Sequence, residues 1–189
     1  MNAVDWRWKI NEAVDRVRTR YDHIGRKTGA PFLAVVYPPE AELAVLKEWH
    51  MLTDSLKPDF DIRVVDALEV TERALEEVGI DEVVATLKEP MPGSCPETEL
   101  GHLWVQALAA EVKTCLSKPE TGKPFASIER LAALYPATGP KSVMQELWDS
   151  AQAVLDGPVI VLIPGAIEEP RTYSFLGKMK EFMYRGDLL

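Results

Sequence analysis

The chain has 189 residues, of which 47% are hydrophobic and 27% are charged, and its formal net charge at pH 7 is -9. This length and composition fit one ordinary globular domain with a full core and exclude a largely disordered protein. We therefore predict a single α/β domain over residues 1–189. The charge is uneven, because residues 1–27 and 171–189 are basic and residues 28–170 are acidic. An acidic body argues against direct nucleic-acid binding over a broad surface, and a local basic edge formed by both ends is left open.

The sequence gives no sign of a membrane or secreted protein. No stretch reaches the ~20 apolar residues that span a membrane, and the first residues mix Trp6 and Trp8 with charged side chains, unlike the apolar core of a secretory signal. Cys95 and Cys115 are the two cysteines. With nothing else that suggests an oxidising compartment, we expect reduced thiols and a cytoplasmic protein.

The first predicted element is a helix over residues 4–24, within an amino-terminal segment of residues 1–27. Apolar residues recur along it at spacings of three and four, which places them on one helix face. They are Ile10, Val14, Val17, Tyr21 and Ile24.

Residues 32–65 predict a strand, a helix and a second strand. Residues 32–37 (FLAVVY) are apolar and lie between turn residues, which is typical of a strand. A helix of about fifteen residues is predicted from Glu40, with Leu43, Leu46 and His50 on its buried side. A second strand follows around residues 62–65. One helix that links two strands is the pattern of a parallel sheet.

Residues 71–157 add mainly helices. Two short ones are predicted, over residues 71–78 with Thr71 as N-cap and over residues 81–87, followed by a proline-rich loop at residues 90–96. A long, mostly buried helix over residues 98–115 precedes a third strand at residues 125–128. A further helix begins at Pro140, and its inward residues are predicted to be Val143, Leu147, Ala151 and Val154.

Residues 159–163 (VIVLI) are aliphatic, with a proline on each side, and predict a strand covered on both faces. Residues 171–189 are predicted to form a closing aromatic and basic helix. The predicted fold is a three-layer α/β domain with a mainly parallel sheet of four to five strands and helices on both faces. Its topology is expected to be P-loop-like without Walker motifs.

Motifs for the common chemistries are missing from the sequence. It contains no G-x-x-x-x-G-K-[ST] phosphate loop, no G-x-G-x-x-G fingerprint, no G-x-S-x-G elbow and no paired zinc ligands. We therefore predict no catalytic, cofactor-binding or metal residue, and no cofactor. One alternative is a small-ligand or metal-binding enzyme that uses the crevice near Pro38-Pro39 and Pro164-Gly165, with Glu40, Glu168 or Glu169, because ligands gather at the carboxyl ends of parallel strands.

The carboxyl-terminal segment combines aromatic and basic side chains, which are enriched at protein interfaces. A terminal helix that docks on its own sheet would use the same residues, and both roles are compatible if one side packs inward. The predicted partner-binding residues are Arg171, Tyr173, Phe175, Lys178, Tyr184 and Arg185.

Short anchors along the chain resemble BrxB-like proteins of the BREX (bacteriophage exclusion) phage-defence systems. The anchors are an aliphatic strand that ends in Pro164-Gly165, Phe175-Leu176-Gly177, Tyr184-Arg185, Pro31-Phe32 with the strand and Pro38 that follow, and Leu134-Tyr135-Pro136. Members often carry a second tyrosine where this chain has Met183. The resemblance implies a noncatalytic adaptor or scaffold for phage resistance that contacts other BREX proteins, PglZ first and also BrxC or PglX.

Overall fold

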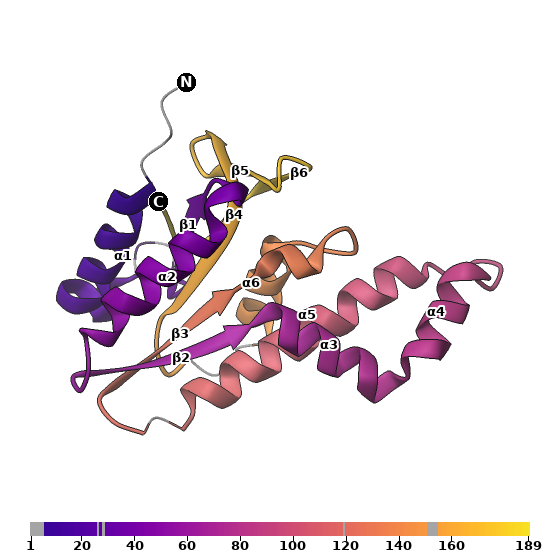
Figure 1. The fold of residues 1–189 in the computed structure, drawn as a ribbon, viewed down its shortest axis with the longest axis horizontal. Helices are drawn as coiled ribbons and strands as arrows, with labels where there is room; N and C mark the ends of the chain where they lie inside the picture. The colour runs from indigo at the N-terminus through magenta and orange to yellow at the C-terminus, as the bar shows by residue number, and fades with distance from the viewer. Residues whose placement is uncertain (1–5, 26, 28, 119, 151–154) are drawn as a thin grey trace.

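The computed structural model describes residues 6–25, 27, 29–118, 120–150 and 155–189, and Figure 1 shows how the elements are arranged. The α-helices are α1 (Trp6–Arg20), α2 (Glu42–Asp54), α3 (Ala67–Val78), α4 (Ile80–Lys88), α5 (Pro96–Leu116) and α6 (Pro140–Asp149). The strands are β1 (Phe32–Tyr37), β2 (Phe60–Asp66), β3 (Lys123–Glu129), β4 (Val159–Glu169), β5 (Thr172–Phe175), β6 (Met179–Phe182) and β7 (Asp187–Leu188). Short 3₁₀ turns are η1 (Tyr21–His23), η3 (Pro39–Ala41) and η4 (Leu131–Leu134).

The centre of the fold is a parallel sheet in the order β2-β3-β4-β1-β7. β1 and β4 pair along the whole of β1, from Phe32 opposite Val159 to Tyr37 opposite Pro164. β4 then continues out of the parallel sheet and pairs with β5 in antiparallel fashion, and β5 pairs with β6. The predicted α/β class with a mainly parallel sheet is confirmed. Among the helices of the described ranges, none has both the length and the apolar character needed to cross a bilayer.

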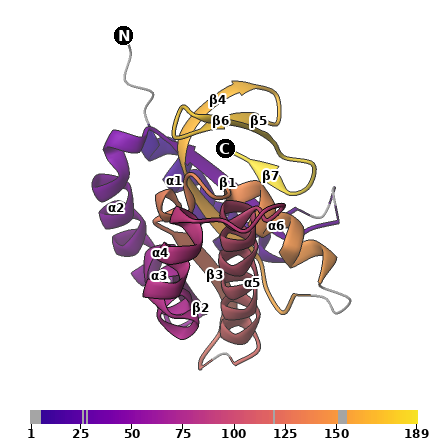
Figure 2. The ribbon, with the colours of Figure 1, turned by 90° about the vertical axis from the view of Figure 1, so that its right-hand side faces the viewer.

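Two hydrophobic cores lie on opposite faces of the sheet, because successive side chains of a strand point to opposite faces. On one face, Leu33 and Val35 of β1 pack with α1 and α2. On the other face, Phe32 and Ala34 pack with α3, α5 and α6. Figure 2 shows α1 and α2 on one side of the strands and α5 and α6 on the other. The expected three layers are therefore present.

The buried side of α2 differs from the prediction. The helix buries Val45, Trp49 and Thr53, whereas Leu43 is 85% exposed and the His50 side chain is half-exposed. Both sets of positions have helical spacing, so the sequence pattern alone does not choose between them. The large Trp49 ring decides the orientation, since it fits against Phe125 of the sheet with ring centroids 6.5 Å apart.

The start of α3 also differs from the prediction. Asp66, the last residue of β2, caps the helix by accepting hydrogen bonds from the backbone N–H groups of Leu68 and Glu69. Thr71 lies inside the helix, where its hydroxyl donates to the Leu68 carbonyl at 3.0 Å. A carboxylate at the N-cap satisfies amide groups that otherwise have no partner, so the helix begins four residues earlier than its apolar pattern suggested.

The helices α5 and α6 begin with a proline at the first position, as expected for α6. Val143 and Leu147 are buried as predicted. Ala151 and Val154, predicted to point inward from the same helix, lie outside the described residues.

The predicted closing helix at residues 171–189 is wrong, because this segment forms β5, β6 and β7. Leu176 and Gly177 have φ values of 53° and 66°, which a hairpin turn accepts and a helix does not. The hairpin also requires Gly165 on β4, since a Cβ there would lie 2.2 Å from the Ser174 carbonyl oxygen. In the sequence, large aromatic residues (Tyr173 and Phe175) alternate with small polar ones, and this period of two is typical of a strand.

Candidate functional site

A crevice lies at the carboxyl ends of β1 and β4, where open α/β sheets bind ligands. Its volume is about 470 Å³. The lining residues are Lys9, Val36, Pro38, Pro39, Glu40, Gly165, Ala166, Ile167, Leu176 and Gly177. The structure thus brings together the two segments that the sequence analysis placed at this crevice, 38–40 and Gly165.

Lys9 is the polar side chain that the sequence analysis missed. It comes from the first turns of α1, is 6% exposed, and donates a hydrogen bond of 2.8 Å from Nζ to the Val36 carbonyl oxygen. Burial lowers the pKa of its amine, because desolvation disfavours the charged form. Within the described ranges no carboxylate lies within ion-pair distance of Lys9. Nothing local in the sequence marks this residue, since its burial results from how α1 docks on the sheet.

The acidic residues of the predicted crevice are separated by the fold. Glu40 lines it, but Glu168 and Glu169 lie farther along β4, and each forms an ion pair of 3.3 Å with Lys180 of β6. In the part of the chain that the structure describes, no group of three or more potential ligands could hold a metal ion. The two glutamates therefore pair across the hairpin, and among the described residues they do not meet Glu40 in a metal site.

A chain of polar contacts joins α2 to the end of β3. Trp49 Nε1 donates to Ser127 Oγ at 2.9 Å, Ser127 Oγ donates to Glu129 Oε1 at 2.9 Å, and His50 Nε2 lies 2.8 Å from Glu129 Oε2. Burial raises the pKa of the Glu129 carboxyl, and His50 and Ser127 oppose this rise. The chain satisfies a buried carboxyl and fixes the orientation of Trp49.

Two predicted partner-binding residues, Tyr173 and Phe175, are fully buried, so in this fold their side chains are not on the surface. The Tyr173 hydroxyl donates to Glu181 Oε2 at 2.6 Å, and burial raises its pKa above the usual range. Both rings belong to the core that covers one face of the sheet. Their packing matches the alternative in which the inward side of this segment docks on its own sheet.

Arg171 also has a structural role. Its Nε donates to the Met183 carbonyl at 2.8 Å and a terminal nitrogen donates to the Gly186 carbonyl at 3.3 Å. These bonds tie the turn between β4 and β5 to the segment before β7. The guanidinium therefore holds the hairpin against the end of the chain.

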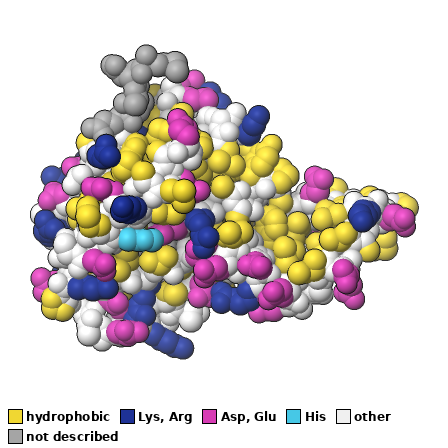
Figure 3. All heavy atoms as spheres, viewed as in Figure 1, with side chains coloured by type: hydrophobic (Ala, Val, Ile, Leu, Met, Phe, Trp, Pro, Cys, Tyr) yellow, Lys and Arg dark blue, Asp and Glu magenta, His cyan; other side chains and the backbone are white. Residues whose placement is uncertain are grey.

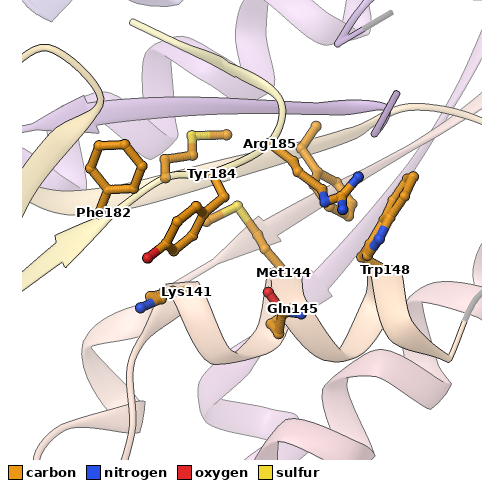
Figure 4. A pocket seen from close by; sticks show the side chains of 9 residues that line it. Lys141, Met144, Gln145, Trp148, Phe182, Tyr184 and Arg185 are labelled. Atoms are coloured by element: carbon orange, nitrogen blue, oxygen red, sulfur yellow. The ribbon is translucent and has the colours of Figure 1, made fainter. Parts of the chain in front are cut away.

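The remaining predicted residues, Lys178, Tyr184 and Arg185, are exposed. Figure 4 shows Arg185 lying over the Trp148 ring of α6, at 4.1 Å from the ring centroid. Tyr184 is 65% exposed and packs against Phe182 with centroids 4.8 Å apart. The depression between β6 and α6 holds only about 20 Å³, so it is a surface for contact and not a pocket for a small molecule. A partner-binding role for these three residues stays a prediction.

A second surface, absent from the sequence predictions, is the segment of residues 78–103, named the α4 arm. Figure 1 shows α4 and the start of α5 projecting away from the sheet. None of the α4 residues is buried, although Ile80, Val83, Val84 and Leu87 follow the spacing of an apolar helix stripe. A groove of about 240 Å³ runs between α4 and α5. Large apolar side chains exposed along the arm are Val78, Ile80, Val84, Leu87 and Met91.

The α4 arm is acidic as well as apolar. It contains five Asp or Glu residues and one lysine, and Glu82 and Glu99 line the groove itself. Figure 3 shows apolar side chains gathered on the projecting arm with acidic side chains around them. The sequence shows the apolar stripe, but only the structure shows that α4 buries none of these side chains.

The fold and these surfaces define an α/β protein with a parallel sheet, a crevice at the strand ends and an uncovered apolar arm. Comparison with known protein families, with curated proteins and with solved structures found no match to this chain.

Proposed function

We propose that this protein is a noncatalytic adaptor that works through contacts with other proteins. The observation that carries the proposal is the α4 arm, in which large apolar side chains are exposed on a helix that buries none of its residues. Exposed apolar surface of this kind marks interaction sites in natural proteins. The lack of catalytic motifs in the sequence supports a role without turnover.

The chemistry of the arm suggests the kind of partner. Ile80 and Val84 offer apolar contacts, and acidic residues such as Glu82 and Glu99 surround the groove. An amphipathic helix with basic flanks would place its apolar face in the groove and its cations on the acidic rim. We infer that the partner presents such a basic amphipathic segment.

The resemblance to BrxB-like proteins supports a place in a cytoplasmic BREX antiviral system, with PglZ as the first expected partner and BrxC or PglX as the others. An adaptor must contact at least two partners or two sites. The exposed residues Tyr184 and Arg185, with Lys178 in the turn before β6, supply a second candidate contact region, far along the chain from the α4 arm.

The test is co-purification of the tagged protein with each BREX protein encoded beside it. We expect the wild type to retain a partner and the Val84→Glu, Leu87→Glu double variant to lose it, because two carboxylates would replace apolar contacts beside an acidic rim. The matched control is Leu43→Glu with Met51→Glu on α2, which also replaces two exposed apolar side chains of one helix and should retain the partner.

Tyr184→Ala with Arg185→Ala tests the second surface in the same assay, and we expect loss of a different partner. Retention of every partner by both double variants would contradict the proposed surfaces. Turnover of a substrate by the purified protein would contradict the noncatalytic role. A gene neighbourhood without methyltransferase, phosphatase-like and large ATPase genes would contradict the BREX assignment.

A further inference from the structure

We propose that the crevice at the ends of β1 and β4 binds a small organic monocarboxylate, whose carboxylate pairs with the Lys9 ammonium and whose apolar body lies along Ile167 and Leu176. This site is separate from the α4 arm and goes beyond the proposed adaptor role. It rests on the volume of the crevice, on the burial of Lys9 without a carboxylate partner among the described residues, and on the character of the crevice walls.

Lys9 has a buried ammonium group, and buried ammonium groups rarely lack a counter-charge. Its side chain is 6% exposed, and the hydrogen bond that it donates, to the Val36 carbonyl, uses one of its three N–H groups. Buried lysines are normally paired with an anion, and the described residues supply none. Burial alone is the cause that lowers its pKa. The Trp8 ring lies 5.9 Å from Nζ but carries no net charge. A ligand carboxylate would supply a counter-charge that the described residues do not, and would accept the remaining N–H groups.

The crevice has room for a ligand of modest size. Its volume of about 470 Å³ lies within the ~300–1,000 Å³ of ordinary small-molecule sites. Apart from Lys9 and Glu40, its walls are apolar side chains, prolines and glycines. Walls of this kind favour an apolar ligand body with one charged group.

The same walls disfavour phosphate groups. Pro38 and Pro39 follow β1 and have no backbone N–H to donate, so the loop cannot form the cradle of amides that holds phosphates. Glu40 lines the crevice and repels a second negative charge. A ligand with one carboxylate fits this pair of charges better than a phosphate ester or a nucleotide.

The test uses benzoate as probe, with benzamide as its neutral counterpart and phenyl phosphate as a dianion. Titrations are followed by the NMR amide signals of Gly165, Ala166 and Gly177, which line the crevice. We expect saturable shifts, with benzoate binding about tenfold more tightly than benzamide because a charge-assisted hydrogen bond is lost. Phenyl phosphate should bind more weakly than benzoate.

Lys9→Met keeps the length of the side chain and removes the charge, so it should abolish the preference of benzoate over benzamide. Lys180→Met, which removes an exposed lysine that pairs with Glu168 and Glu169, is the matched control and should leave the preference unchanged. If Lys9→Met does not fold, Ala166→Trp tests the site without touching Lys9, since the ring would fill the crevice and abolish the shifts.

Equal affinities for benzoate and benzamide in the wild type would overturn the proposal, as would a preference that survives Lys9→Met. Tighter binding of phenyl phosphate would overturn the choice of a monocarboxylate. Shifts that persist in Ala166→Trp would show that the probe binds elsewhere. The Val84→Glu, Leu87→Glu variant should bind benzoate normally, which separates this site from the adaptor surface.

Discussion

Apolar side chains are buried in the central sheet but exposed in the α4 arm. All six residues of β1 are buried, and Leu162 of the neighbouring β4 has no exposed surface. In α4, an equally apolar stripe buries no residue, and Ile80 is 50% exposed. The same apolar patterning therefore occurs in two settings in this chain, namely the buried core of the sheet and an exposed helix surface.

The difference follows from what covers each region. The sheet is covered on both faces by helices, so its side chains are removed from water and contribute most of the folding free energy. The arm lies beyond the end of the sheet, and its groove is bounded by the last residue of α3, by α4 and by the start of α5. Its large apolar side chains, such as Ile80 and Val84, are therefore left in contact with water.

The largest expected effect comes from matched leucine truncations in the two regions. Leu162→Ala should lower the free energy of unfolding by ~2–5 kcal/mol because it leaves a cavity in the core. Leu87→Ala, in the α4 arm, should change it by no more than ~0.5 kcal/mol, as for most surface substitutions. Urea denaturation of both variants measures the difference. A similar loss in both would mean that the arm is part of the core.

A smaller effect is expected at Asp66, where the sheet ends and the helix leading to the arm begins. Its carboxylate caps α3 and also pairs with Arg130. Asp66→Ala should cost ~0.5–2 kcal/mol through loss of the cap. Asp66→Asn keeps an oxygen for the cap and removes only a partly exposed ion pair, so thermal unfolding should show a loss of no more than ~1 kcal/mol. Equal losses would assign the stabilisation to the ion pair instead of the cap.

The smallest expected effect is a pH dependence of the unfolding free energy that arises from the buried Glu181 carboxyl. Burial raises the pKa of the Glu181 carboxyl, opposed by hydrogen bonds from Tyr173 and the Lys141 backbone. A raised pKa in the folded state gives a contribution to stability that is fully present below the unfolded pKa and is lost as pH rises through the folded pKa.

Glu181→Gln keeps an oxygen that accepts both hydrogen bonds and removes this titration. The unfolding free energy of the wild type, relative to that of the variant, should therefore decrease as the pH rises from about 4.5, the ordinary value for this carboxyl. Urea denaturation at several pH values measures the trend. Parallel pH profiles for the two proteins would contradict it.

The helix and strand content of the first 160 residues was largely predictable from local patterns. The strand at residues 32–37 has the predicted bounds, and the long helix over residues 98–115 was found within two residues at each end. These segments have strong periodicity and clear proline or glycine boundaries. The side of α2 that is buried was not predictable, because two sets of positions in one helix had the same spacing and Trp49 packs on the sheet through long-range contacts.

The position of the strand-end crevice was predictable from the sequence, but the charged side chains around it were not. The strand-end crevice lies where the residues Pro38, Pro39 and Gly165 suggested. Lys9 was missed because it is far from Pro38, Pro39 and Gly165 in the sequence, and it reaches the crevice only because α1 docks on the sheet. Glu168 and Glu169 were expected near the crevice, but the continuation of β4 into the hairpin carries them to Lys180.

The sequence by itself determined the class of the fold, because alternating and helical apolar patterns and their turn residues act over a few neighbours. Only the tertiary structure decided that β7 joins the parallel sheet, since its partner β1 lies far earlier in the chain, whereas β5 and β6 form hairpins with neighbouring segments. It also decided that Lys9 is buried and that α4 is not. Burial is a property of what packs on a residue, and in this protein the packing partners are far away in the chain.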